Sequence, residues 1–164
     1  MELTQQFYSN LSNITVILAV IAVFFYLYLH KKGRILDFII ALTLAVSVSE
    51  GFKFYFNTPR PVSTLNLEGG AFPSTHATVA YTAFFFYLLV CHTFTQGKGT
   101  SFKELRKPKE AAFFIAIFLL SFASAMLRIL AVAHYLTDII AGIILGLLIS
   151  FVFVYYDLTA RRSE

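Results

Sequence analysis

The chain has 164 residues, of which 58% are hydrophobic and 13% are charged, and its mean hydropathy is +0.74. A soluble domain of this length is nearer half apolar, so the composition argues against one and predicts a protein whose solvent is lipid. The sequence pI of about 9.2 does not by itself indicate a nucleic-acid partner, because basic residues in membrane proteins usually set the topology. We expect no nucleic acid to bind.

Five stretches are long enough to cross a hydrocarbon core of ~30 Å as helices. In chain order they are residues 11–30, 35–56, 74–95, 110–130 and 134–157. Backbone groups in lipid must be bonded internally, so each stretch is predicted to be helical. Runs such as AAFFIAIFLL lack the polar–apolar alternation of a β-barrel strand. The sequence therefore predicts an all-α fold: a polytopic membrane bundle of about five transmembrane helices, forming one domain over residues 1–164.

The basic residues predict how this bundle is oriented. With five spans, ten of the 13 Lys and Arg residues fall on one side of the membrane, which the positive-inside rule makes cytoplasmic. The N-terminus is then outside and the C-terminus is in the cytoplasm. These ten residues are Lys31, Lys32, Arg34, Lys98, Lys103, Arg106, Lys107, Lys109, Arg161 and Arg162.

The other three cations, Lys53, Arg60 and Arg128, fall at the outer ends of spans or in the loop after the second span. A charge inside a span costs about 2.5–3.5 kcal/mol on insertion scales. The presence of Lys53 and Arg128 in spans therefore indicates that each has a local interaction or function. His76 and His134 begin spans at the same outer face. Three cations and two imidazoles are therefore predicted to converge on one surface.

The first of three motifs on this surface runs from Lys53 through six residues to Arg60 and Pro61. Pro59 and Pro61 cannot continue a helix, so the second span should stop just before them. Two cations at this separation can bind different oxygens of one phosphate. Taken alone, the motif is explained equally well by a Lys at the membrane interface and an unrelated Arg in the following loop.

The second motif is Pro73-Ser74-Thr75-His76 at the start of the third span. Ser is a favoured N-cap residue, and the free amides of a helix start bind anions. His76 in the first turn can give a proton to a departing oxygen. An ordinary capped helix start has the same pattern.

The third motif is Arg128, five residues, His134, three residues and Asp138. His134 and Asp138 are four residues apart, so on one helix they share a face and the carboxylate can orient the imidazole. The same face continues to Gly142 and Gly146, which predicts close approach of a neighbouring helix. A buried His–Asp pair used only for packing is the alternative.

In this order the three motifs resemble the type-2 phosphatidic acid phosphatase family, whose pattern is Lys-(six)-Arg-Pro, Pro-Ser-Gly-His and Ser-Arg-(five)-His-(three)-Asp. The resemblance implies that His134 is a nucleophile that forms a phosphohistidine, Asp138 its orienting acid and His76 the general acid. It also implies catalysis without a metal ion or another cofactor. The residues implied to bind the phosphoryl oxygens are Lys53, Arg60, Arg128, Ser74 and Thr75.

The sequence departs from the family pattern at two positions. Thr75 replaces Gly, which puts a β-branched residue in the phosphate loop, and Leu127 replaces the Ser before Arg128. Both departures put activity and substrate choice in doubt. Neither removes a cation, an imidazole or the aspartate.

The resemblance predicts a lipid phosphate phosphatase in a bacterial or archaeal plasma membrane. The topology predicted from the basic residues puts its active site on the exterior. The substrate would be a phosphomonoester or a diphosphate of a membrane lipid. The candidates are an isoprenoid carrier diphosphate, lipid A 1-phosphate, phosphatidylglycerophosphate and phosphatidic acid.

Three alternatives remain open from the residues. A lipid phosphotransferase would use the same site with an alcohol in place of water. A transporter or channel would use Glu50, Lys53, Arg128 and Asp138 as an ion path. A haem-binding bundle would use His30 and His92 near the inner ends of their spans.

Overall fold

The computed structural model describes residues 2–61, 69–93 and 108–160, apart from the side chains of residues 92, 93 and 156–160. Within these ranges the chain forms helices and no strand, as the composition predicts. Several of the expected cytoplasmic basic residues and the side chain of His92 lie outside this description. The elements are α1 (Glu2–His30), η1 (Lys32–Arg34), α2 (Ile35–Phe56), α3 (Thr75–Thr93), α4 (Pro108–Leu130) and α5 (Leu136–Ala160).

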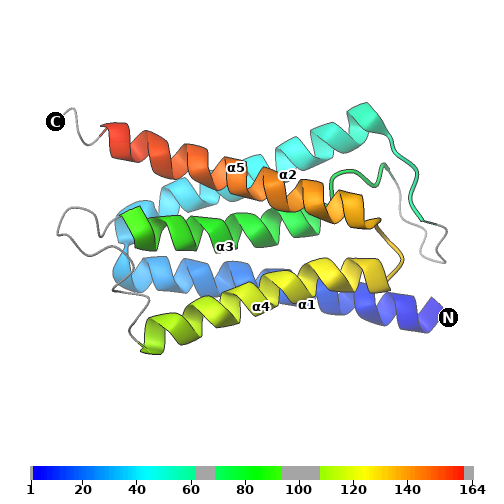
Figure 1. The fold of residues 1–164 in the computed structure, drawn as a ribbon, viewed down its shortest axis with the longest axis horizontal. Helices are drawn as coiled ribbons and strands as arrows, with labels where there is room; N and C mark the ends of the chain where they lie inside the picture. Colours follow the sequence, from blue (N-terminus) through cyan, green and yellow to red (C-terminus); the bar gives the residue numbers. More distant parts are fainter. Residues whose placement is uncertain (1, 62–68, 94–107, 161–164) are drawn as a thin grey trace.

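The five α-helices form a bundle in which α3 contacts all four of the others (Figure 1). Successive helices run in opposite directions along the long axis of the bundle. The beginning of α1, the end of α2, the beginning of α3, the end of α4 and the beginning of α5 therefore lie at the same end, on the right in Figure 1. This arrangement brings the three sequence motifs to one end of the bundle.

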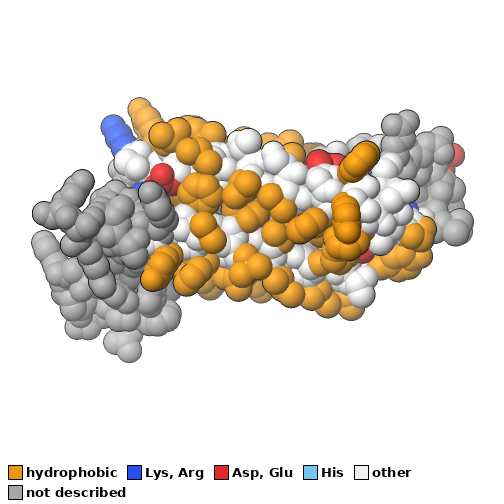
Figure 2. Space-filling view, turned by 90° about the horizontal axis from the view of Figure 1, so that it is seen from above, with side chains coloured by type: hydrophobic (Ala, Val, Ile, Leu, Met, Phe, Trp, Pro, Cys, Tyr) orange, Lys and Arg blue, Asp and Glu red, His pale blue; other side chains and the backbone are white. Residues whose placement is uncertain are grey.

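Four helical segments are long and apolar enough to cross a membrane. Their large hydrophobic side chains are extensively exposed and cover the bundle surface seen in Figure 2, as expected of a surface that faces lipid. The predicted third span differs, because the apolar part of α3, Thr75–Cys91, is shorter than the other four. This helix is the inner one: Ala77, Ala80, Phe86 and Tyr87 are all fully buried.

The contact between α3 and α5 is close because two glycines of α5 face the backbone of α3. A Cβ atom on Gly142 would lie 2.8 Å from the Ser74 carbonyl oxygen, and one on Gly146 would lie 2.8 Å from the Thr78 carbonyl oxygen. The predicted close approach at these glycines is confirmed. It leaves no room for any side chain at either position.

Several helix beginnings also differ from those of the predicted spans. The helix α1 begins at Glu2, nine residues before the expected start of the first span at Leu11, and α5 begins at Leu136, two residues after the expected start at His134. At the other end of the bundle, Arg34 is not a solvated loop residue: it is buried, and its Nη1 lies 3.0 Å from Oδ2 of Asp37.

We predict that Gly142→Ala lowers the free energy of unfolding by about 1–3 kcal/mol, because the new methyl group must push α5 away from α3. Thermal unfolding in detergent measures the change. Gly51→Ala is the matched control, since Gly51 lies in α2 and a Cβ there meets nothing within 4 Å. That variant should be neutral or slightly stabilised through its better helix propensity. Equal behaviour of the two variants would contradict the close contact.

Candidate active site

The turn between α4 and α5 places His134. α4 ends in a Schellman motif, in which the Val132 N–H donates to the Ile129 carbonyl (2.9 Å) and the Ala133 N–H donates to the Arg128 carbonyl (3.0 Å). Val132 takes the left-handed position with φ of 54°, where glycine is the usual residue and a β-branched side chain is strained. The turn ends α4 and leads the chain directly to His134.

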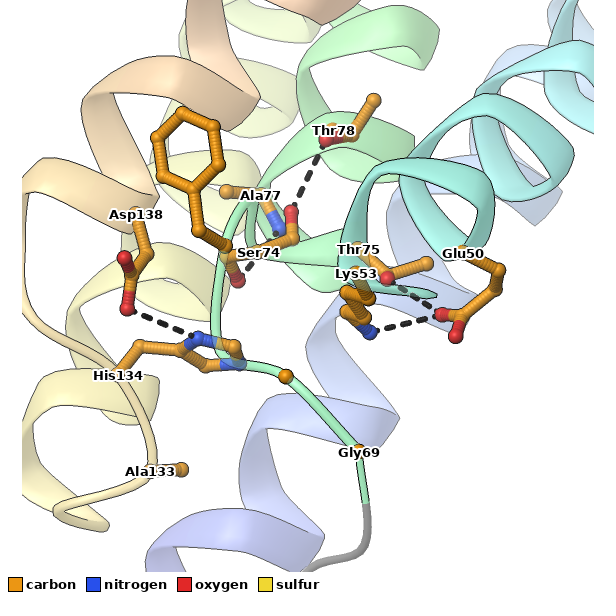
Figure 3. Close-up of polar contacts among 12 residues, drawn as sticks. Glu50, Lys53, Gly69, Ser74, Thr75, Ala77, Thr78, Ala133, His134 and Asp138 are labelled. Atoms are coloured by element: carbon orange, nitrogen blue, oxygen red, sulfur yellow. Dashed lines mark hydrogen bonds and ion pairs between the residues drawn. The ribbon is translucent and has the colours of Figure 1, made fainter. Parts of the chain in front are cut away.

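His134 and Asp138 approach each other, but not on one helix as the spacing predicted. That expectation is wrong, because the turn after α4 continues to Tyr135 and His134 therefore precedes α5. Nδ1 of His134 still lies 3.4 Å from Oδ2 of Asp138, an ion-pair distance longer than that of a good hydrogen bond (Figure 3). Oδ2 of Asp138 also accepts the Tyr135 backbone N–H at 2.9 Å, which fixes the carboxylate at the start of α5.

His134 is 3% exposed, and its surroundings are cationic. Burial, followed by the charges of Arg128, Arg60 and Lys53 and by the nearby His76, lowers the pKa of His134 from 6.5 to about 2. The imidazole is therefore neutral at physiological pH and keeps a lone pair for attack. The charges that act on the ring belong to residues of α2, α3 and α4 and to Arg60, which follows α2.

Arg60 connects two segments of the chain through backbone carbonyl groups. Its Nε donates to the Gly69 carbonyl (3.1 Å), its Nη2 to the Gly70 carbonyl (3.1 Å) and its Nη1 to the Ala133 carbonyl (3.2 Å). Gly70 in turn packs on the end of α2, where a Cβ atom would lie 2.7 Å from the Lys53 carbonyl oxygen. The guanidinium is thus held next to His134 and ties the loop before α3 to the turn before α5.

Ser74 precedes α3 and is fully buried. Its backbone N–H donates to the Asp138 carbonyl at 3.0 Å, which joins the beginnings of α3 and α5. Its Oγ lies 3.5 Å from the backbone N of Ala77, a long version of the N-cap hydrogen bond that the motif predicts. Thr75, the departure from the family pattern, is the first helical residue of α3.

Lys53 in the last turn of α2 is paired with a carboxylate. Its Nζ donates to Oε1 of Glu50 at 2.7 Å, and the Thr75 hydroxyl donates to the same oxygen at 2.7 Å (Figure 3). The side chains of Lys53 and Glu50 are 13% and 54% exposed. Glu50 and Lys53 are three residues apart on one helix, a spacing that allows them to pair. The sequence carried no sign of the bond from Thr75.

α1 contributes two residues that sequence reasoning missed. Arg128 is 5% exposed, and its Nη1 donates to Oγ of Ser9 at 2.9 Å. Nε2 of His76 lies 2.7 Å from Oδ1 of Asn13. Neither Ser9 nor Asn13 belongs to one of the three motifs. The available signal was the polar stripe Gln5, Ser9 and Ser12, which follows helical spacing and is buried along α1.

Arg60 and Arg128 are fixed near a neutral, buried imidazole, and Lys53 and His76 are close enough to act on it. Such a set of groups can bind an anion and attack it. Within the described ranges, no group of three His, Cys, Asp or Glu side chains lies close enough to hold a metal ion.

Comparison with protein-family models gives one match: residues 34–162 match the model of the PAP2 superfamily. No curated protein sequence matches the chain significantly.

Two solved structures share the fold. One is a transmembrane PAP2-type phosphatidylglycerolphosphate phosphatase from Bacillus subtilis, with a TM-score of 0.67 and 16% identity over 97% of this chain and 79% of that one. The other is LpxE from Aquifex aeolicus, with a TM-score of 0.64 and 19% identity over 95% of this chain and 88% of that one. At these identities the likeness describes the fold alone.

We predict that the His134 ring stays neutral down to about pH 4, because its pKa is lowered by burial and by nearby positive charge. The ¹⁵N chemical shifts of the imidazole in detergent report the protonation state. The signal is assigned by its loss in His134→Gln. A ring that takes up a proton between pH 6 and 7 would show that it is neither desolvated nor surrounded by cations.

Proposed function

The chain belongs to the PAP2 superfamily, and we propose that it releases phosphate from a phosphorylated membrane lipid through a phosphohistidine at His134. As a member of this family it is a hydrolase of lipid phosphates, embedded in a membrane. The observation that carries the proposal is the buried His134, with the Asp138 carboxylate on its Nδ1 side and the Arg60 guanidinium bound to the carbonyl of the preceding residue.

In the proposed reaction His134 attacks phosphorus. With the Asp138 carboxylate on its Nδ1 side, the imidazole carries its proton on Nδ1 and presents the lone pair of Nε2. A bond forms between Nε2 and phosphorus as the bond from phosphorus to the lipid oxygen breaks. Water then attacks the phosphohistidine, and inorganic phosphate leaves.

The cations supply the electrostatic stabilisation. Arg60 and Arg128 are held by hydrogen bonds to other parts of the chain, so their charges are in place before the substrate arrives. Fixed positive groups in a site with little water stabilise the charge of a transferring phosphoryl group strongly. The two arginines and Lys53 would contact the non-bridging oxygens, with Ser74, Thr75 and the amides at the start of α3 nearby.

His76 would protonate the departing lipid oxygen. Its Nε2 is 2.7 Å from Oδ1 of Asn13, and an amide oxygen there accepts a proton carried on Nε2. Asn13 would therefore hold the protonated His76 ring through its Nε2–H, and the proton given to the leaving oxygen would come from Nδ1.

An apolar cavity next to the phosphate loop supports a lipid substrate. It has a volume of about 250 Å³ and lies between α2 and α5, lined by Phe52, Phe72, Pro73 and Ile144 among others. Pro73 directly precedes Ser74, so an acyl or isoprenoid chain in this cavity would lead to the site. The candidates remain an isoprenoid carrier diphosphate, lipid A 1-phosphate, phosphatidic acid and phosphatidylglycerophosphate. The last is the lipid in the name of the Bacillus subtilis protein.

The proposed orientation puts the N-terminus and the site outside a bacterial or archaeal plasma membrane and the C-terminus in the cytoplasm. Its support is the positive-inside pattern of the loops. We propose that the reaction needs no metal ion, since three cations of the chain can neutralise the phosphate.

We predict that His134→Ala lowers the rate of phosphate release by about 10³-fold or more, because it removes the nucleophile. The rate is measured in detergent with phosphatidylglycerophosphate, phosphatidic acid and an isoprenoid diphosphate. Brief reaction with ³²P-labelled substrate should leave an alkali-stable, acid-labile label on the wild-type chain and none on the variant.

His30→Ala is the control for replacing a histidine, because His30 lies at the opposite end of the bundle and is exposed. It should keep the wild-type rate. Appreciable turnover by a folded His134→Ala variant would reject the assignment of the nucleophile. Loss of activity in EDTA that returns with a divalent metal would reject the metal-independent reaction.

We predict that Asn13→Ala lowers kcat about fivefold, since His76 loses a hydrogen bond worth ~1 kcal/mol. Asn10→Ala is the matched control, because Asn10 is exposed on the same helix, as Asn13 is, but its Oδ1 accepts a hydrogen bond from Gln6 of α1. Equal rates for the two variants would show that α1 has no part in proton transfer.

A further inference from the structure

Lys53 is paired with Glu50 in the structure, so a substrate phosphate would have to compete with Glu50 for it. A substrate phosphate and the Glu50 carboxylate are both anionic acceptors, and Lys53 is a single ammonium group on a flexible stem. In the structure its Nζ lies on Oε1 of Glu50 at 2.7 Å. A phosphate that is to use Lys53 must therefore draw it away from Glu50 or share it.

The pair is accessible to a ligand. Glu50 and Lys53 line a cavity of about 340 Å³, together with Asn57, Gly69 and Gly70. The two glycines belong to the loop that Arg60 holds by its carbonyl groups. The cavity therefore borders both the Glu50–Lys53 pair and the arginine-anchored loop.

Thr75 gives Glu50 a second donor. Its hydroxyl lies 2.7 Å from the same oxygen that Lys53 contacts, so Glu50 keeps a hydrogen bond if Lys53 leaves. This bond stabilises the carboxylate after the transfer of Lys53 and lowers the cost of that transfer. It also joins α2 to the first residue of α3, next to Ser74 and His76.

We propose that Glu50 competes with the substrate phosphate for Lys53, and that Thr75 retains Glu50 on α3 while Lys53 moves to the phosphate. The exchange involves hydrogen bonds and no covalent step. Glu50 thereby limits the affinity of the site for phosphate, and it takes Lys53 back as inorganic phosphate leaves. This inference rests on the proposed function, and it makes Glu50 and Thr75 positioning residues that act through Lys53.

The first test is Glu50→Gln, which keeps the shape of the side chain and removes its charge. Orthovanadate and inorganic phosphate are the probes, assayed as inhibitors of phosphate release by the full chain in detergent. Both inhibition constants and KM should fall about fivefold, which corresponds to losing an ion pair of ~1 kcal/mol. Unchanged or weaker inhibition would overturn the proposal, because a residue that only supports Lys53 would weaken binding when altered.

The second test uses Thr75, where the inhibition constant should change in the opposite direction. Thr75→Val keeps the branched shape but removes the hydroxyl, so Glu50 should hold Lys53 more tightly and the orthovanadate inhibition constant should rise about threefold. Thr75→Ser keeps the hydroxyl, so its inhibition constant should rise less than that of Thr75→Val. The double variant Glu50→Gln/Thr75→Val should behave as Glu50→Gln does, since Thr75 acts through the carboxylate. Additive effects in the double variant would overturn the coupling.

The outcomes separate this inference from the proposed function. If the wild-type chain releases phosphate and His134→Ala does not, the function stands whatever the Glu50 variant does. If the wild-type chain neither releases phosphate nor is inhibited by orthovanadate, the function and the competition both fail. Should Glu50→Gln not fold, the Thr75→Val and Thr75→Ser pair decides by the same inhibition constants.

Discussion

The site depends on the close contact between α3 and α5. The Ser74 N–H donates to the Asp138 carbonyl, and Gly142 and Gly146 allow the two helix backbones to meet without side chains between them. Ser74 and Asp138 belong to motifs that are about sixty residues apart in sequence. Because the contact is made by backbone atoms, it has little freedom to shift, and the positions of the groups that follow on each helix are fixed with it.

Much of the fold was predictable because lipid restricts the choice of structure. A chain this apolar must satisfy its backbone hydrogen bonds within helices, and prolines 59 and 61 mark where α2 ends. The grouping of Lys53, Arg60, Arg128, His76 and His134 at one end followed from counting spans. The short apolar length of α3 was less predictable. This helix is packed among the other four helices and has less surface that faces lipid.

The details of the site were not predictable because they depend on where helices end and which faces meet. The spacing of His134 and Asp138 suggested one helix, whereas His134 lies before the start of α5 and only Asp138 lies in its first turn. Their side chains nevertheless approach each other. The partners of the cations differ in kind: backbone carbonyls for Arg60, a hydroxyl for Arg128 and a carboxylate for Lys53. Of these partners only Glu50, three residues before Lys53 on α2, follows from a spacing rule. The partners of the two arginines come from other segments of the chain.

The position of α1 limits which parts of the chain can be replaced in a chimaera. The family match begins at residue 34, after α1, yet α1 carries Ser9 and Asn13, which contact Arg128 and His76. A chimaera that joins residues 34–162 to an unrelated leading helix would retain every motif residue and still leave a guanidinium and an imidazole without these partners. The smallest segment that keeps the site intact is therefore longer than the family match. A transfer of the site into another membrane protein must include α1.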